Sequence, residues 1–113
     1  MREQLTLPVE VPPLRPGIRY GDQILMNGSC FTEHISDKLL RYKYQVLTNP
    51  FGILYNPVSI AVSMERIAKK QYYTQDELVF HHGLYHSLDH HGHYSGKDIH
   101  EVTHSLNRTI DEA

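Results

Sequence analysis

Short apolar runs and helical apolar stripes alternate along the first half of the chain. Residues 24–26 form an uninterrupted apolar run typical of a buried strand, and residues 45–48 form the next strand candidate. Between them, residues 31–42 carry an apolar stripe at helical spacing, made of Phe31, Ile35 and Leu39. A strand, a helix and a second strand make a βαβ unit, in which the strands are parallel and the crossover is right-handed. The pattern therefore predicts an α/β protein.

The second half of the chain is predicted to be mainly helical. Asn56 and Pro57 are favoured residues at a helix start, and an apolar stripe follows at Ile60, Met64 and Ile67. The capping-box pattern of residues 74–77 predicts a short helix that runs to about residue 81 and stops at Gly83. Residues 84–94 lack a helical period and are expected to form a loop or an irregular strand.

A last helix is predicted from the spacing of four apolar residues, Ile99, Val102, Leu106 and Ile110. This pattern reaches almost to residue 113, and no glycine or proline stop signal follows it. We therefore expect an incomplete domain, the N-terminal part of a larger α/β domain. The apolar face of this helix would be left uncovered, which predicts a homo-oligomer or association with the remainder of a longer chain.

Composition narrows the possible partners. Residues 1–20 hold four of the six prolines and are expected to be extended, whereas residues 21–113 form the folded part. The formal net charge of −2 gives no basic footprint for nucleic acid, and no apolar run is long enough to span a membrane. A single cysteine, together with an N-terminus unlike a signal peptide, predicts a cytoplasmic protein.

The residues Gly28-Ser29-Cys30-Phe31 are placed where a nucleophile is often found, between a strand and a helix. A helix start presents unpaired N–H groups and a positive dipole end to a bound group. The competing interpretation is that Ser29 only caps the helix, because serine is among the best capping residues. Cys30 is expected to be a small buried packing residue, because neighbouring helical side chains diverge by about 100°.

Three segments together resemble the GSCFA family. They are residues 28–32, which read Gly-Ser-Cys-Phe-Thr with Thr32 in place of the family's alanine, the block of residues 49–57, and residues 86–92. The family resembles the SGNH hydrolases, which are serine esterases with a three-layer, flavodoxin-like parallel sheet. The resemblance implies ester or acyl-ester hydrolysis, with a small-molecule or carbohydrate ester as substrate and no cofactor.

The resemblance also implies roles for three residues. Ser29 matches the nucleophile, and Gly52 and Asn56 match the backbone and side-chain donors of an oxyanion hole. Alternatively, Gly52 is a turn glycine and Asn56 a helix cap. SGNH hydrolases take their base from an Asp-x-x-His motif, which does not occur here. The base is then either missing or supplied by the loop of residues 86–93.

Histidines suggest a different function. All but His34 of the nine histidines fall between residues 81 and 104, and clustered histidines can bind zinc or nickel. His86, His90 and His93 are the candidate ligands, although their spacing matches no standard metal motif. A third possibility is a non-catalytic fragment that needs a partner chain.

Overall fold

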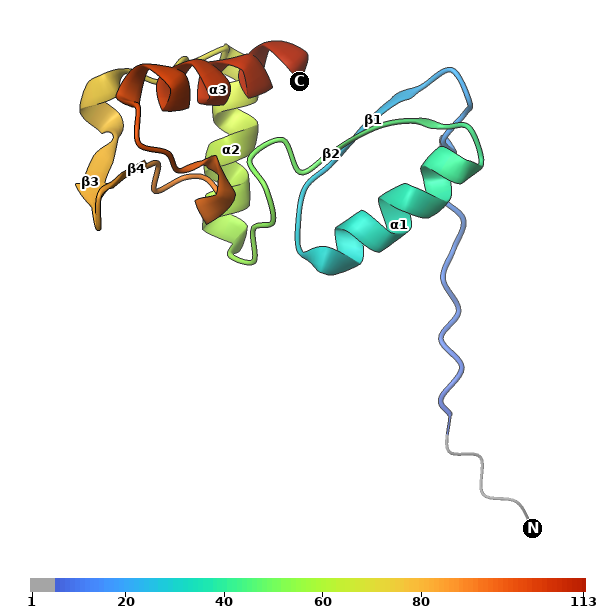
Figure 1. Cartoon of the computed structure of the whole chain (residues 1–113). Helices are drawn as coiled ribbons and strands as arrows, with labels where there is room; N and C mark the ends of the chain where they lie inside the picture. Colours follow the sequence, from blue (N-terminus) through green and yellow to red (C-terminus); the bar gives the residue numbers. More distant parts are fainter. Residues whose placement is uncertain (1–5) are drawn as a thin grey trace.

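The computed structural model describes residues 6–113, which form an α/β chain (Figure 1). The elements in order are β1 (Gln23–Met26), α1 (Cys30–Arg41), β2 (Gln45–Thr48), α2 (Pro57–Lys69), β3 (Val79–His81), β4 (Leu84–His86) and α3 (Ile99–Glu112). Two short 3₁₀ helices, η1 (Gln75–Glu77) and η2 (Gly92–Tyr94), lie in the connections. No helix in this part of the chain is both long and apolar enough to cross a membrane.

The predicted βαβ unit is confirmed. β1 and β2 pair in parallel, with Gln23 opposite Gln45 and Met26 opposite Thr48. Helix α1 connects them and packs against β2, where the buried Ser36 hydroxyl hydrogen-bonds to the hydroxyl of Thr48. This parallel arrangement brings the carboxyl ends of both strands, and the loops that follow them, to one side.

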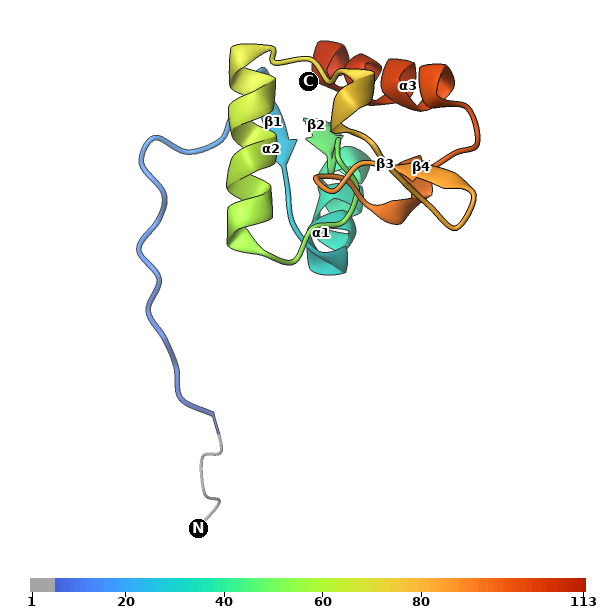
Figure 2. The same cartoon turned by 90° about the vertical axis from the view of Figure 1, so that its left-hand side faces the viewer.

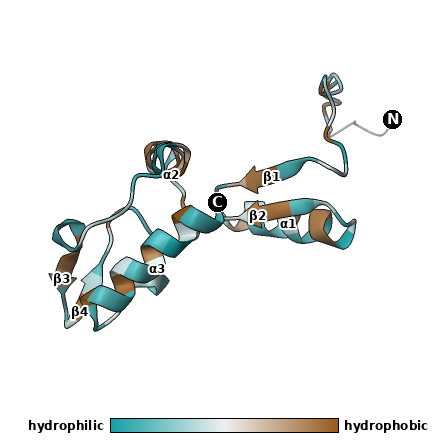
Figure 3. Ribbon diagram, turned by 90° about the horizontal axis from the view of Figure 1, so that it is seen from above, coloured by the Kyte–Doolittle hydropathy of each residue, from teal (hydrophilic) through white to brown (hydrophobic). Residues whose placement is uncertain are grey.

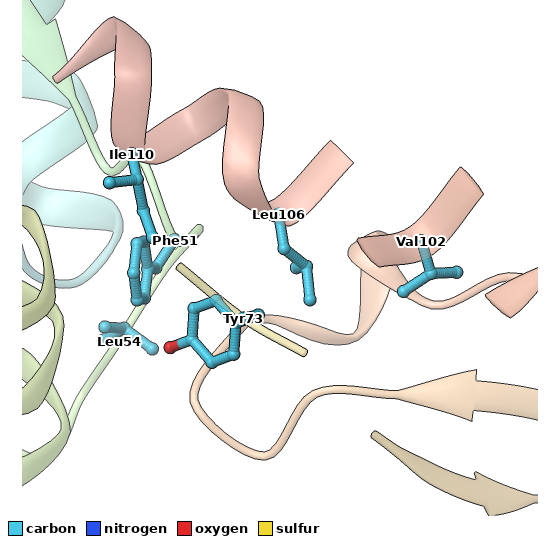
Figure 4. Close-up of a cluster of buried hydrophobic side chains, with 6 residues drawn as sticks. All are labelled: Phe51, Leu54, Tyr73, Val102, Leu106 and Ile110. Atoms are coloured by element: carbon cyan, nitrogen blue, oxygen red, sulfur yellow. The ribbon is translucent and has the colours of Figure 1, made fainter. Parts of the chain in front are cut away.

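The second half of the chain builds the hydrophobic core. Six buried side chains make up this core, namely Phe51, Leu54, Tyr73, Val102, Leu106 and Ile110 (Figure 4). Phe51 and Leu54 come from the segment that follows β2, while three of the others line one face of α3. The core therefore joins the connecting segment to the C-terminal helix.

Two predictions about apolar faces were wrong. The face of α3 that was expected to lie uncovered is the core itself, because Phe51, Leu54 and Tyr73 pack on it. Phe31, in contrast, is 70% exposed rather than buried. It lies in the first turn of α1, which follows β1 and extends past the ends of the two strands (Figure 1). Cys30, in the same turn, is exposed and not a packing residue.

The helix predicted to reach residue 81 is also absent. The capping box of Thr74 and Glu77 is present, but it opens only the short η1. β3 and β4 then form an antiparallel hairpin, with Val79 opposite His86. His82 and Gly83 connect them with φ values of 49° and 77°, which is the left-handed backbone that a two-residue hairpin turn requires.

Residues 6–113 contain two separate two-stranded sheets rather than one larger parallel sheet. The elements fall into two groups, one of β1, α1 and β2 and the other of α2, α3 and the hairpin (Figures 1 and 3). Residues 6–20 contain no helix or strand and run away from both groups (Figure 2). The described residues therefore do not form the expected three-layer arrangement around one parallel sheet.

The two loops at the carboxyl ends of β1 and β2 are tied together by Asn49. Its N–H donates to the carbonyl of Met26 at 2.8 Å, and its side-chain oxygen accepts from the buried Gly28 N–H at 2.9 Å. Asn49 itself is buried and has a left-handed φ of 44°. Asparagine tolerates this backbone better than most residues and supplies the acceptor that Gly28 needs.

Replacing Asn49 by glycine tests this tie. Asn49→Gly keeps the left-handed backbone but leaves the Gly28 N–H without its acceptor, which should lower the free energy of unfolding by about 1–3 kcal/mol. Lys43→Gly is the matched control, because Lys43 is exposed and has a left-handed φ of 68°. Urea unfolding should leave that control within about 0.5 kcal/mol of the parent. Equal effects of the two substitutions would show that the Asn49 side chain contributes nothing.

Candidate active site

Ser29 lies where the sequence predicts it, directly after β1 and at the start of α1. It is the N-cap of the helix, with φ −81° and ψ −172°, and it is partly exposed. Its hydroxyl nevertheless makes no capping hydrogen bond to the described helix. The first intrahelical bond runs from the Thr32 N–H to the Ser29 carbonyl at 3.0 Å. The N–H groups that precede Thr32 at the helix start have no intrahelical acceptor.

The β2–α2 loop lies beside Ser29. The Leu54 N–H donates to the carbonyl of Gly28 at 3.0 Å, one residue before Ser29. Together with the Asn49 bonds, this contact holds the two loops that carry the predicted site residues against each other. Parallel pairing of β1 and β2 brings both loops to the same edge of the sheet.

Gly52 is a tightly packed turn residue with a left-handed φ of 82°. Its N–H donates to the carbonyl of Asn49 at 2.8 Å, so in this conformation the donor is engaged within the turn. A side chain at this position would bring its Cβ within 2.4 Å of His91 Cβ and 3.0 Å of His93 Cε1. The absence of a side chain therefore lets two histidines approach the loop beside Ser29.

His91 and His93 form an interacting pair. Their Nδ1 atoms are 2.8 Å apart, and His91 Nδ1 also accepts the backbone N–H of His93 at 3.3 Å. The two imidazole rings thus contact each other through their Nδ1 atoms. The His91 N–H bonds to the Phe51 carbonyl at 2.9 Å and fixes the pair against the loop.

Asn56 is the N-cap of α2. Its side-chain oxygen accepts the Val58 N–H at 2.8 Å, as the capping interpretation requires. This bond uses only the carbonyl oxygen and leaves the amide NH₂ able to donate. Asn56 is exposed, so capping and donation to a bound group are compatible.

His90 has a structural environment quite unlike that of its neighbours. It is 8% exposed and stacks on Phe51 with a centroid distance of 3.9 Å, while Ser87 Oγ lies 2.8 Å from its Nδ1. Burial, and to a lesser degree the positive charges of Arg66 and His93, lower its pKa from 6.5 to about 3. His90 is therefore a neutral core residue.

Asp89 interacts with Tyr73 and Arg66. Its carboxylate accepts the Tyr73 hydroxyl at 2.8 Å and lies 3.6 Å from the Arg66 guanidinium. The Arg66 group also sits 3.9 Å from the centre of the Tyr73 ring. Burial is the main cause of the raised pKa of Tyr73, followed by its bond to Asp89. The carboxylate next to His90 in sequence thus belongs to a structural network.

The three candidate metal ligands do not converge. His86 Nδ1 bonds to Ser95 Oγ at 2.7 Å and its Nε2 lies 3.0 Å from the His81 carbonyl, while His90 is in the core. Across residues 6–113, no three His, Cys, Asp or Glu side chains are arranged to hold a metal ion. The histidine-rich segment divides instead into hairpin, core and loop-facing residues.

Sequence reasoning did not single out Asn49 or the contact of His91 with Gly52. The signal for Asn49 was its position before Pro50 at the end of a strand, where a left-handed asparagine can begin a tight turn. Nothing local indicated the contact of His91 with Gly52, because it joins residues far apart in sequence.

Comparison with known proteins supports one assignment. The sequence model described as the GSCFA family matches residues 23–113, which include all elements described above. No curated protein and no solved structure matches the chain.

The low pKa of His90 predicts a pH-dependent stability. In the unfolded chain this histidine binds a proton near pH 6.5, but in the folded chain only near pH 3. Its contribution is complete above pH 6.5 and is lost as the pH falls toward 3. Between pH 7 and pH 5 the free energy of unfolding should fall by about 2 kcal/mol. Urea unfolding of His90→Phe should lack this part of the slope, whereas His104→Gln, at an exposed position, should retain it.

Two glycine positions separate backbone strain from the histidine contact. Gly83 has a φ of 77° and open space around it, so Gly83→Ala should cost only about 1–2 kcal/mol of backbone strain. Gly52→Ala carries the same strain and also collides with His91, which should add roughly 1–3 kcal/mol. Adding His91→Gly should remove that excess. Thermal or urea unfolding that finds the two alanine variants equal would rule out the close contact.

Proposed function

The chain belongs to the GSCFA family, and on this basis we propose that it is an SGNH-like serine hydrolase that cleaves ester bonds. The observation that carries the proposal is the Ser29 hydroxyl, which sits at a helix start but is not used to cap the helix. An N-cap serine normally bonds to an N–H of the first turn. The Ser29 hydroxyl makes no such bond and is therefore available to react with a substrate.

The proposed reaction begins with attack of Ser29 Oγ on the carbonyl carbon of an ester. The hydroxyl proton passes to a base, and the carbonyl oxygen becomes an oxyanion. Collapse of this intermediate expels the alcohol, which takes the proton back from the base, and leaves an acyl group on Ser29. Water then repeats the sequence and releases the acid. In this proposal the first N–H groups of α1 and the Asn56 amide donate to the oxyanion.

His93 is the base in this proposal. The Nδ1 contact with His91 orients the His93 ring, and a positioned imidazole is the usual partner of a serine nucleophile. His91 is then the positioning residue. Gly52 supplies the space that allows this pair to lie against the loop, while its own N–H would have to leave Asn49 before it could bind an oxyanion.

Other features of the proposal rest on the family likeness. The proposed fold is a three-layer α/β arrangement around a parallel sheet, in which β1, α1 and β2 make one unit. The substrate class is an ester of a small molecule or an acylated carbohydrate, and no cofactor is required. A cytoplasmic location remains a prediction from the sequence.

Ser29→Ala is the direct test. The parent chain should react with a fluorophosphonate probe and hydrolyse p-nitrophenyl acetate, and Ser29→Ala should do neither. Ser59→Ala is the matched control, because Ser59 is also a partly buried serine near a helix start. Circular dichroism should show that both variants fold. A parent chain that ignores the probe, or labelling that survives Ser29→Ala, would contradict the proposal.

The same assay tests the base. His93→Gln should lower the hydrolysis rate by at least ~100-fold, whereas His104→Gln should not change it. An unchanged rate in His93→Gln would leave Ser29 as nucleophile but remove His93 from the reaction.

A further inference from the structure

Asn27 links the loop that carries Ser29 to helix α2. It is the first residue after β1, and its side-chain NH₂ donates to the Ser63 hydroxyl at 3.1 Å. Ser63 is fully buried in α2, and its own hydroxyl donates to the Ile60 carbonyl at 2.7 Å. The Ser63 hydroxyl is therefore held in one orientation, with an oxygen lone pair left to accept from Asn27.

This bond reaches the helix itself, whereas the other ties of the Ser29 loop do not. Asn49 and Leu54, which bond to Gly28, both precede α2. Among residues 6–113, the bond from Asn27 to Ser63 is the only hydrogen bond between α2 and residues 23–48. The nucleophile loop is thus attached to α2 as well as to the loop before it.

Two attachments along α2 restrain the direction of its axis. The first lies just before the helix, where the Leu54 N–H bonds to the Gly28 carbonyl at 3.0 Å. The second, at Ser63, lies about 10 Å further along the helix than Asn56, at 1.5 Å per residue. The apolar stripe of α2 also packs on the core, but apolar contacts are non-directional and allow small rotations. The hydrogen bond from Asn27 removes that freedom.

The orientation of α2 decides where the Asn56 amide points. The Asn56 side-chain oxygen accepts the Val58 N–H at 2.8 Å, so the amide plane is fixed to the first turn of the helix. Its NH₂ group therefore turns with the helix. Hydrogen bonds weaken steeply as they lose alignment, so a small rotation of α2 reduces what this amide can donate to a bound group.

We propose that Asn27 is a positioning residue for the ester hydrolysis. Through Ser63 it sets the orientation of α2, and with it the direction in which the Asn56 amide donates to the oxyanion. This inference rests on the proposed function, in which Asn56 is an oxyanion donor and Asn27 does not touch the substrate. Because the oxyanion exists only in the transition state and the intermediate, loss of alignment should lower kcat and leave ester binding unchanged.

Kinetics of p-nitrophenyl acetate hydrolysis by the full chain test the proposal. Asn27→Ala and Ser63→Ala break the same bond from its two sides, so each should lower kcat by at least ~5-fold, with KM within ~2-fold of the parent. The double variant should lose no more than either single variant. Ser59→Ala is the matched control in the same helix and should leave kcat unchanged.

The variant Asn56→Ala separates positioning from a general loss of structure. In this background Asn27→Ala should lower kcat no further, because the donor that Asn27 orients is gone. A fall in kcat that persists in this background, or an unchanged kcat in Asn27→Ala, would overturn the role of Asn27 while leaving the hydrolase intact.

A readout without catalysis distinguishes this role from the activity itself. In ¹H–¹⁵N NMR spectra, Ser63→Ala should shift the amide resonances of Gly28 and Ser29, whereas Ser59→Ala should not. Unshifted resonances in Ser63→Ala would overturn the link between α2 and the nucleophile loop. An inactive parent that shows the shifts would instead refute the proposed function, and the role of Asn27 in catalysis with it.

Discussion

The structure depends on the contacts that Asn49 makes with the first loop of the chain. The βαβ unit and the helical half share few direct contacts between their helices and strands. The segment that follows β2 joins them. Its Asn49 bonds to Met26 and Gly28, and its Phe51 and Leu54 enter the core beneath α3. One short segment thus fixes the start of α1 and at the same time anchors the hydrophobic core.

This arrangement explains why chemistry is concentrated at one place. Parallel strands bring the loops after β1 and β2 together, and the Leu54–Gly28 bond joins them one residue before Ser29. Packing of Phe51 against His90 brings the neighbouring histidines over Gly52. The His91–His93 pair is therefore positioned by the core. A site built in this way gains its geometry from burial of apolar side chains rather than from the local sequence.

Local patterns were reliable where neighbouring residues determine the outcome. The spacing around residues 24–48 predicted the βαβ unit, Asn56 and Pro57 predicted the start of α2, and the Thr74–Glu77 capping box is present. The same patterns failed where a residue distant in sequence determines the structure. The capping box opens only one turn because β3 pairs with β4, and the face of α3 is buried because Phe51 and Tyr73 cover it.

The histidine-rich segment shows both what the local sequence determines and what only contacts between distant residues determine. The sequence by itself determined that histidines cluster there and that Ser29 follows a strand and precedes a helix. The sequence could not distinguish the environment of His90 from those of His91 and His93, because all three lie within one stretch of four residues. Only the tertiary structure decided that Phe51 and Arg66 surround His90 and lower its pKa, while Gly52 lets His91 and His93 approach the loop beside Ser29. The physical reason is that protonation and packing depend on neighbours in space, and those neighbours lie some tens of residues away along the chain.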